Sequence, residues 1–212
     1  MDLKTKEIEE GLDRLFPSPK CELNYKNNYE LLVAVILSAQ CTDKRVNIVV
    51  GELFKKYDTP QKMLTLTQEE LEEKIHSCGF YHNKAKNILS MSRDLIDKFN
   101  GEVPQDLEQL QTLAGVGRKT ANVVYSEAFG GDAIAVDTHV LRVSNRLALA
   151  STDDPYKCEL ALMKAFDKSK WGKLHLQMVL FGRYVCKAQK PLCQECPFTK
   201  ICKYYLQHRH NI

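Results

Sequence analysis

An informative part of this chain is a break between two helical stretches, which reads LAGVGRKTA from Leu113 to Ala121. Apolar residues recur at helical spacing before the break, over Asp106 to Leu113, and after it, over Arg118 to Phe129. Glycine adopts positive φ at little cost and lets another backbone approach closely. The Gly115-Val116-Gly117 break therefore predicts a tight helical hairpin.

The residues after the glycines suggest what this hairpin binds. Its second helix begins at Arg118 and Lys119, so the positive end of the helix dipole coincides with two cationic side chains. Such a helix start binds a phosphate without reading base sequence. A Gly-x-Gly turn alone is a weak indication of function. The basic pair, together with the cysteine loop described next, makes it much stronger.

A second motif lies near the C-terminus, where Cys186, Cys193, Cys196 and Cys202 follow a C-x6-C-x2-C-x5-C pattern within seventeen residues. Four thiolates from one compact loop match the ligand number of tetrahedral zinc or of an iron–sulfur cluster, and spacing alone does not separate the two. Disulfides or incidental thiols are the alternative. The N-terminal residues do not resemble a secretory signal, so we expect a reducing compartment, where metal binding is favoured over disulfides.

Charge is unevenly distributed along the 212 residues, whose net charge is only +3. Residues 183–212 carry six basic side chains and one acidic side chain, Glu195, so this segment holds +5 and the remainder −2. A basic patch around a metal loop suits a polyanionic partner, although a solvated basic tail explains the charge equally well. The longest uninterrupted apolar run, Leu31 to Leu37, is far too short to cross a membrane.

The rest of the chain predicts an all-α protein. Thr67 and Glu70 form a capping box at the start of one helix, and Asn100-Gly101 and Gly130-Gly131 interrupt the pattern. Only the short run Ala133 to Val136 shows strand-like alternation. The further segments with apolar residues at helical spacing are 6–16, 29–38, 42–57, 67–78, 83–99, 137–147, 156–166 and 173–186.

Several motifs in order identify a family. The hairpin stretch, the run AVDTHVLRV over Ala135 to Val143, the run LSAQCTD over Leu37 to Asp43 and the cysteine spacing together resemble endonuclease III, a DNA glycosylase family of the helix-hairpin-helix superfamily. The resemblance extends from about Tyr29 to Tyr204. One departure is Ala114, where the family commonly has proline before the first hairpin glycine, so the turn loses some rigidity.

The resemblance implies that Lys119 is a nucleophile and Asp137 its acidic partner. A neutral amine attacks the anomeric carbon of a damaged nucleotide, expels the base and forms a Schiff base, after which β-elimination cuts the strand. The dipole at the start of the helix disfavours an ammonium, and a nearby carboxylate stabilises the oxocarbenium-like sugar. From the residues alone, Lys119 also reads as a phosphate contact and Asp137 as a plain helix N-cap.

The resemblance also implies double-stranded DNA as the partner, with oxidised pyrimidines flipped out of the duplex. Gln40 and Phe80 correspond to the residues that enter the gap left by the flipped nucleotide. Relatives often carry an aliphatic residue at the second position, so Phe80 is either a stacking wedge or a core aromatic. Gly115, Gly117 and Arg118 are expected to bind the DNA backbone.

In this family the cysteine pattern holds a [4Fe–4S] cluster, so the resemblance favours iron–sulfur over zinc. Lys187 and Lys190 lie between the first two ligands and are expected to contact phosphates, with the cluster as a rigid scaffold. The other thiols occur in scattered contexts and are expected to be ordinary buried cysteines; they are Cys21, Cys41, Cys78 and Cys158.

The implied fold has two helical domains that flank a catalytic cleft. One comprises residues 23–131, with six helices and the hairpin at about 106–129, and the other comprises 1–22 plus 132–212, with the cluster loop at 186–202. Lys119 and Asp137 then lie on opposite sides of the Gly130-Gly131 junction and face each other across the cleft. The resemblance implies a monomer in the cytoplasm, associated with the nucleoid and not with a membrane.

Three other functions fit part of the sequence. An adenine glycosylase of the same superfamily relies on a carboxylate in the early helix, but Leu31 to Leu37 contains no acid and Lys119 is present. A non-catalytic DNA-binding module would leave the pair of Lys119 and Asp137 without a purpose. A ferredoxin-like electron carrier does not require a large helical body. A bifunctional DNA glycosylase and abasic-site lyase therefore fits best.

Overall fold

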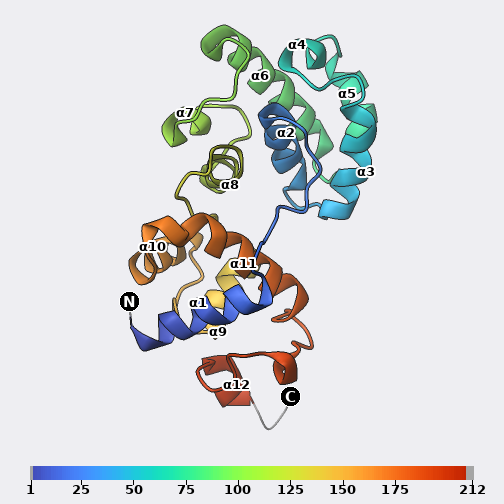
Figure 1. Cartoon of the computed structure of the whole chain (residues 1–212). Helices are drawn as coiled ribbons and strands as arrows, with labels where there is room; N and C mark the ends of the chain where they lie inside the picture. The colour runs from blue at the N-terminus through green and yellow to red at the C-terminus, as the bar shows by residue number, and fades with distance from the viewer. Residues whose placement is uncertain (1, 209–212) are drawn as a thin grey trace. The chain divides into compact units, whose positions relative to one another are not determined.

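The computed structural model describes residues 2–208, and every regular element in that range is helical (Figure 1). The predicted all-α class is therefore confirmed. Ala133 to Val136, the run with strand-like alternation, is buried but belongs to no strand. Among the described residues, no helix is both long and apolar enough to span a membrane. Arg209, one of the basic residues of the C-terminal segment, lies outside the described residues.

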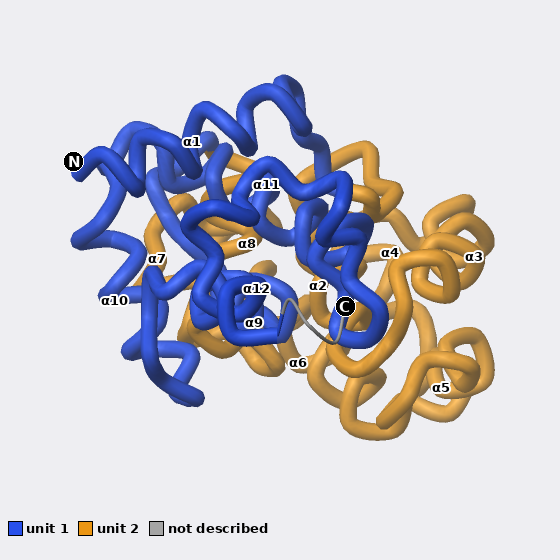
Figure 2. Tube along the Cα trace, turned by 90° about the horizontal axis from the view of Figure 1, so that it is seen from below, with its two compact units in different colours: residues 1–21, 130–212 blue, residues 22–129 orange. Residues whose placement is uncertain are grey.

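The chain divides into two compact units, coloured separately in Figure 2. Unit 1 consists of Met1–Cys21 and Gly130–Ile212, and unit 2 consists of Glu22–Phe129. The helices of unit 2 are α2 (Asn28–Ser38), α3 (Asp43–Leu53), α4 (Pro60–Met63), α5 (Gln68–Ile75), α6 (Tyr81–Phe99), α7 (Leu107–Gln111) and α8 (Arg118–Phe129). Those of unit 1 are α1 (Leu3–Leu15), α9 (Thr138–Arg146), α10 (Pro155–Ala165), α11 (Trp171–Tyr184) and α12 (Lys203–His208), with short 3-10 turns at Lys168–Lys170 and Cys193–Glu195.

Helix α2 lies at the centre of unit 2. Every residue from Tyr29 to Leu37 is buried, because α2 packs against α3, α6 and α8 at once. A helix that is apolar on all sides is stable only when neighbours cover all of it. Each fully buried leucine, isoleucine or valine contributes roughly 1.5–3 kcal/mol relative to exposure. Helix α2 is therefore a rigid support for whatever follows Ser38.

The ends of the helices in unit 2 follow local sequence signals. The capping box of Thr67 and Glu70 is present at the start of α5, as predicted. Asn100 ends α6 in the left-handed conformation, with φ 53°. Helix α4 was not expected, because four residues are too few to show an apolar period; Thr59 caps it and Pro60 begins it.

Unit 1 has a continuous core of its own. Helix α1 packs against α11, and α9 packs against both α10 and α11. The core contains Ile8 and Leu12 from α1 together with residues of the C-terminal helices. The N-terminal segment therefore completes the core of the C-terminal one.

An aromatic ring joins the cysteine loop to this core. Phe198 is fully buried, and its ring lies edge-on to Phe181, with centroids 5.3 Å apart. The same ring packs so tightly on Gly11 of α1 that any Cβ at position 11 would collide with it. The loop between Cys186 and Cys202 is thus anchored to α11, which precedes it, and to α1, which is distant in sequence.

Candidate active site and cysteine centre

The hairpin connects α7 to α8 through two glycines with different surroundings. Gly115 has φ +77°, a conformation that side chains rarely adopt, and a Cβ there would lie 3.0 Å from the Cβ of Asn87 in α6. A Cβ on Gly117 would meet nothing within 4 Å. Val116 between them is buried and holds the turn to the core of unit 2. Gly115 is therefore needed by the fold, whereas Gly117 leaves an open space at the surface.

Helix α8 begins directly at this open space. The carbonyl of Gly117 accepts a hydrogen bond from the N–H of Ala121 at 2.9 Å, which closes the first turn of the helix. Arg118 and Lys119 are both exposed in that turn. The positive end of the helix dipole and two cationic side chains are thus presented to solvent at one point.

A second exposed point of unit 2 is formed by Gln40 and Phe80. Both residues adopt the left-handed conformation, with φ 51° and 59°, and both are exposed. A Cβ on Gly79 would lie 3.4 Å from the carbonyl oxygen of Gln40, so the two turns touch. Left-handed backbone costs non-glycine residues of the order of 1 kcal/mol or more, and such strain clusters at binding sites.

The side chain of Phe80 is 63 % exposed. The alternative reading of this residue as a core aromatic is therefore wrong. Phe80 stands at the N-cap position of α6 and makes no capping hydrogen bond with its side chain. The ring of a large aromatic residue left in water at a strained position is free to stack on a ligand.

In unit 1, Asp137 is the N-cap of α9. One carboxylate oxygen accepts a hydrogen bond from the N–H of Val140 at 2.8 Å, and the side chain is half-buried. An N-cap of this kind contributes about 1 kcal/mol to stability. It also fixes the carboxylate in one orientation. The capping role is therefore real, and it leaves the second carboxylate oxygen to other partners.

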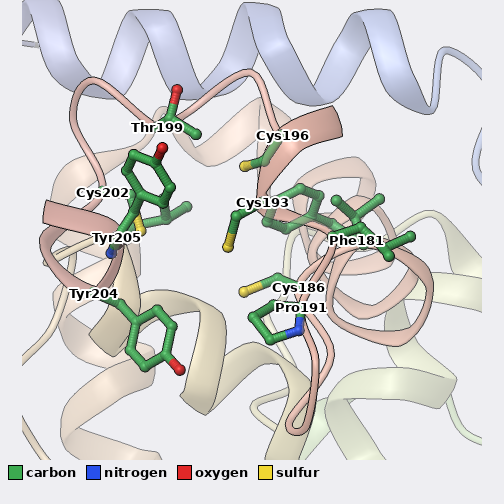
Figure 3. Close-up of a pocket in the computed structure, with 12 residues that line it drawn as sticks. Phe181, Cys186, Pro191, Cys193, Cys196, Thr199, Cys202, Tyr204 and Tyr205 are labelled. Carbon is green, nitrogen blue, oxygen red and sulfur yellow. Dashed lines mark hydrogen bonds between the residues drawn. The ribbon is translucent and has the colours of Figure 1, made fainter. Parts of the chain in front are cut away.

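The four C-terminal cysteines line one cavity of unit 1. Figure 3 shows the sulfur atoms of Cys186, Cys193, Cys196 and Cys202 directed toward a common space, where Phe181, Pro191 and Tyr205 are also drawn. The empty volume is about 340 Å³ when open solvent at its mouth is included. Cys186 follows α11, Cys193 begins the 3-10 turn at Cys193–Glu195, Cys196 directly follows that turn, and Cys202 directly precedes α12.

The cavity is poorly suited to free thiolates. Burial raises the pKa of the Cys196 thiol to about 11, and it raises the pKa of Cys193 and of Cys202 in the same direction. A bound metal supplies the positive charge that such thiolates need. Among residues 2–208, however, no three His, Cys, Asp or Glu side chains gather around one point closely enough to hold a single ion.

Two arginines of α9 secure the first cysteine. Arg142 donates to the carbonyl oxygens of Cys186 at 3.1 Å and Gly182 at 2.7 Å. Arg146 donates to the sulfur of Cys186 at 3.4 Å and to the carbonyl oxygen of Lys187 at 2.7 Å. Sequence reasoning missed the role of Arg146. The only signal was its spacing of four residues from Arg142, which places both on one face of the helix.

The remaining basic and cysteine residues are placed as follows. Lys187 and Lys190 are exposed on the loop between the first two cysteines, and Lys190 has a left-handed φ of 48°. Among the other thiols, Cys78 and Cys158 are buried as expected. The expectation of burial is wrong for Cys21 and Cys41, which are partly exposed and lie in irregular segments.

Comparison with known proteins agrees with these features. The family model described as HhH-GPD superfamily base excision DNA repair protein matches residues 33–168. Endonuclease III of Bacillus subtilis (strain 168) is 50 % identical over 205 residues, which cover 95 % of this chain and 94 % of the relative. The chain belongs to the endonuclease III family.

Solved structures of the endonuclease III family include the same fold bound to DNA. A trapped covalent endonuclease III–DNA intermediate superposes with a TM-score of 0.92 at 50 % identity, covering 99 % of this chain and all of that one. A non-covalent endonuclease III–DNA complex gives a TM-score of 0.94 at 48 % identity, with both chains covered completely. The expected fold and the expected class, a DNA glycosylase and abasic-site lyase of base excision repair that binds DNA, are confirmed.

The structure groups the predicted site residues within each unit. Unit 2 contains the Gln40 and Phe80 turns and the hairpin with Lys119, all exposed. Unit 1 contains Asp137 at the start of α9 and the cysteine cavity near its end, where Arg146 lies. The roles of these residues in binding and catalysis stay predictions.

Proposed function

We propose that this protein excises oxidised pyrimidines from duplex DNA and cuts the strand 3′ to the resulting abasic site, with Lys119 as the nucleophile. The observation that carries the proposal is the exposed Lys119 in the first turn of α8, directly after a hairpin with open space at Gly117. A nucleophile must be reached by its substrate, and the hairpin leaves room for a DNA backbone beside the amine.

The chemistry begins with the neutral amine of Lys119. Its nitrogen bonds to C1′ of the damaged nucleotide while the glycosidic bond breaks, and the base leaves with the bonding electron pair and takes up a proton. Opening of the sugar ring gives the iminium of a Schiff base. Loss of a proton from C2′ then expels the 3′ phosphate by β-elimination, and water finally releases the lysine.

Asp137 is the proposed acidic partner. Its carboxylate stabilises the positive charge that develops on the sugar and carries protons between the reacting groups. The hydrogen bond from Val140 supports this role, because it holds one carboxylate oxygen in place. Cap and catalyst are therefore compatible in one side chain.

The remaining exposed residues of unit 2 serve DNA binding in this proposal. Gly115, Gly117 and Arg118 bind the phosphate backbone at the hairpin, where contacts are independent of sequence. Gln40 and the ring of Phe80 fill the gap left by the extruded nucleotide. An aromatic wedge stacks on the neighbouring bases, and this stacking is worth about 1–3 kcal/mol per base.

The cysteine cavity is the proposed site of a [4Fe–4S] cluster, held by Cys186, Cys193, Cys196 and Cys202. A single zinc ion draws its sulfur ligands to about 2.3 Å from one point, whereas each cysteine of a [4Fe–4S] cluster binds a different iron. The cavity that all four cysteines line supports the cluster. When bound, the cluster supplies a rigid scaffold, from which Lys187 and Lys190 contact phosphates.

The two units are proposed to act as the two domains of the fold, 23–131 and 1–22 plus 132–212, with the catalytic groups contributed by both. The enzyme acts as a monomer in the cytoplasm, where its DNA substrate recruits it to the nucleoid. The substrate requirement supports this location.

The cluster is tested on the purified protein. Analysis should find iron, and the visible spectrum should show a broad absorbance; a colourless protein containing zinc would contradict the cluster.

Borohydride trapping tests the mechanism. Wild-type protein is incubated with a duplex that contains thymine glycol or an abasic site, and the Schiff base is reduced to a stable adduct. We expect a covalent protein–DNA adduct that is absent for Lys119→Ala. No adduct with the wild-type protein would overturn the lyase mechanism, and an undiminished adduct with Lys119→Ala would overturn the choice of nucleophile.

A further inference from the structure

A buried lysine lies beneath the exposed turns of unit 2. Lys84, in the first turns of α6, is only 5 % exposed. Its ammonium donates to the carbonyl oxygen of Leu37 at 2.8 Å and to that of Ala39 at 2.7 Å. Leu37 lies in the last turn of α2 and Ala39 is its C-cap, so both carbonyls stand where a helix leaves these groups without partners of its own. A charged group is rarely buried unless hydrogen bonds compensate for its lost hydration, and here the two carbonyls provide them.

The two carbonyls belong to residues that come just before Gln40. Helix α2 ends at Ser38, and the N–H of Cys41 closes the turn by donating to the carbonyl of Ser38 at 3.0 Å. Gln40 itself adopts the left-handed conformation within this turn. Lys84 therefore holds the backbone on the N-terminal side of Gln40, the residue in the left-handed conformation.

Lys84 also holds the turn that carries Phe80. Its backbone N–H donates to the carbonyl of Phe80 at 3.1 Å, which fixes Phe80 as the residue that starts α6. Gly79, the preceding residue, is in contact with the carbonyl of Gln40. A single residue thus bonds the backbone of both turns, through its side chain on one and its main chain on the other.

We propose that Lys84 is a positioning residue that fixes Gln40 and Phe80 relative to each other, so that both enter the gap in the DNA together. The inference rests on the proposed function of these two residues. Two side chains that must fill one gap need a fixed mutual geometry before they meet the duplex, since ordering them afterwards reduces the rate. A lysine suits this place because its ammonium binds two carbonyls at once, which an apolar side chain does not.

The surroundings of Lys84 exclude a second nucleophile. Its ammonium is buried and engaged by two carbonyls, so a sugar has no access to it. The ionisable groups that interact electrostatically with this ammonium are the thiols of Cys78 and Cys41. Lys84 therefore acts through Gln40 and Phe80 and makes no bond to the substrate.

Two variants and one control separate positioning from general loss of structure. Lys84→Met removes the ammonium at nearly constant length, and Lys84→Arg restores charge and donors. Tyr29→Phe is the matched control, because it deletes a buried 2.7 Å hydrogen bond to Ser92 between the same two helices, α2 and α6, at a distance in sequence from both turns. Borohydride trapping on an abasic site in single-stranded DNA counts active enzyme, since a single strand has no gap to fill.

The main readout is single-turnover excision of thymine glycol from a duplex, normalised to active enzyme. We expect Lys84→Met to be slower by about tenfold or more, while its trapping on single-stranded DNA stays within about twofold of wild type. Lys84→Arg should recover part of the rate, and Tyr29→Phe should match wild type after normalisation. A duplex with 2-aminopurine opposite a tetrahydrofuran abasic analogue should show a smaller fluorescence rise with Lys84→Met, because the opposite base stays stacked.

The outcomes distinguish this inference from the proposed function. If wild-type protein traps and excises normally but normalised Lys84→Met does so too, positioning by Lys84 is wrong and the glycosylase mechanism stands. Equal losses in Lys84→Met and Tyr29→Phe would also overturn it, since they would show a general packing effect. Failure of the wild-type protein in both assays would overturn the proposed function itself.

Discussion

Lys84 and Lys119 both lie near the start of a helix in unit 2, yet their surroundings are opposite. Lys84 is buried, its ammonium is bonded to two carbonyls, and burial lowers its pKa. Lys119 is exposed beside an open space at the hairpin. A lowered pKa is often taken as the sign of a catalytic lysine. Here the perturbed lysine is inaccessible and the accessible one is the proposed nucleophile, so access decides between them.

The largest effect should come from substituting each of the two lysines separately and comparing the variants in the same trapping assay. Lys119→Ala should lower formation of the covalent adduct by about 10³-fold or more, because no other exposed amine occupies its place in α8. Lys84→Met should still form the adduct on single-stranded abasic DNA. Gel electrophoresis of the reduced complex measures both. Loss of the adduct in Lys84→Met, with the protein folded, would reverse the comparison.

The next effect concerns the carboxylate proposed to assist Lys119. Asp137→Asn retains the N-cap of α9, since asparagine caps as well as aspartate. The free energy of unfolding should therefore change by less than about 0.5 kcal/mol, while the rate of base excision falls by roughly 10²-fold or more. Single-turnover kinetics and calorimetry on the same preparation test this pair of outcomes. A stability loss that matches the activity loss would reduce Asp137 to a cap.

The hairpin that presents Lys119 can be tested one glycine at a time. Gly115→Ala should destabilise the protein by about 1–3 kcal/mol, because it combines a left-handed φ with a contact at 3.0 Å to Asn87. Gly117→Ala should leave the unfolding free energy within about 0.5 kcal/mol, since a Cβ there meets no protein atom within 4 Å.

Binding to DNA should show the reverse order for the two glycines. Gly117→Ala is expected to weaken binding to an abasic duplex by about tenfold, if a phosphate occupies the open space. A fluorescence anisotropy titration at fixed salt measures this loss. Unchanged affinity in Gly117→Ala would show that DNA does not approach the hairpin at this point.

The smallest effect is the contribution of Lys84 to the pH dependence of stability. Because burial lowers its pKa below the usual 10.5, the folded protein releases this proton at a lower pH than the unfolded chain does. The unfolded state thus binds more protons between the two values, and stability contributed by Lys84 rises as pH increases toward 10.5. The change in unfolding free energy between pH 7 and pH 10, measured by denaturant titration, should be larger by this rise for wild type than for Lys84→Met.

Local signals were sufficient to predict most of the helices. The capping box at Thr67, the stop at Asn100 and the start of α8 at Arg118 are set by residues adjacent in sequence, and each appears as expected. Helices α4 and α12 and the 3-10 turn at Cys193 were not predicted, because three to six residues show no apolar period. Short elements depend on tertiary contacts that a linear pattern does not contain.

The candidate site was predictable only where a motif carries it. Lys119, Asp137 and the cysteines stand in recognisable runs, and the structure shows the local surroundings of each. Lys84 and Arg146 were missed, since lysine and arginine usually lie at the surface and only three-dimensional packing buries the one against α2 and the other against Cys186. The difference between Gly115 and Gly117 depends on Asn87, which is remote in sequence.

Helix α6 fixes the distance between two exposed points of unit 2, the turn at Phe80 and the hairpin. Phe80 stands at its start, and Asn87, two turns later, lies against Gly115 of the hairpin. At 1.5 Å per residue, these seven residues fix a rise of about 10 Å. Helix geometry therefore sets the spacing between the proposed wedge, Phe80, and the proposed phosphate site at the hairpin. An insertion of one residue between positions 81 and 86 would turn Asn87 by about 100° away from the hairpin, even if every side chain at both points were unchanged.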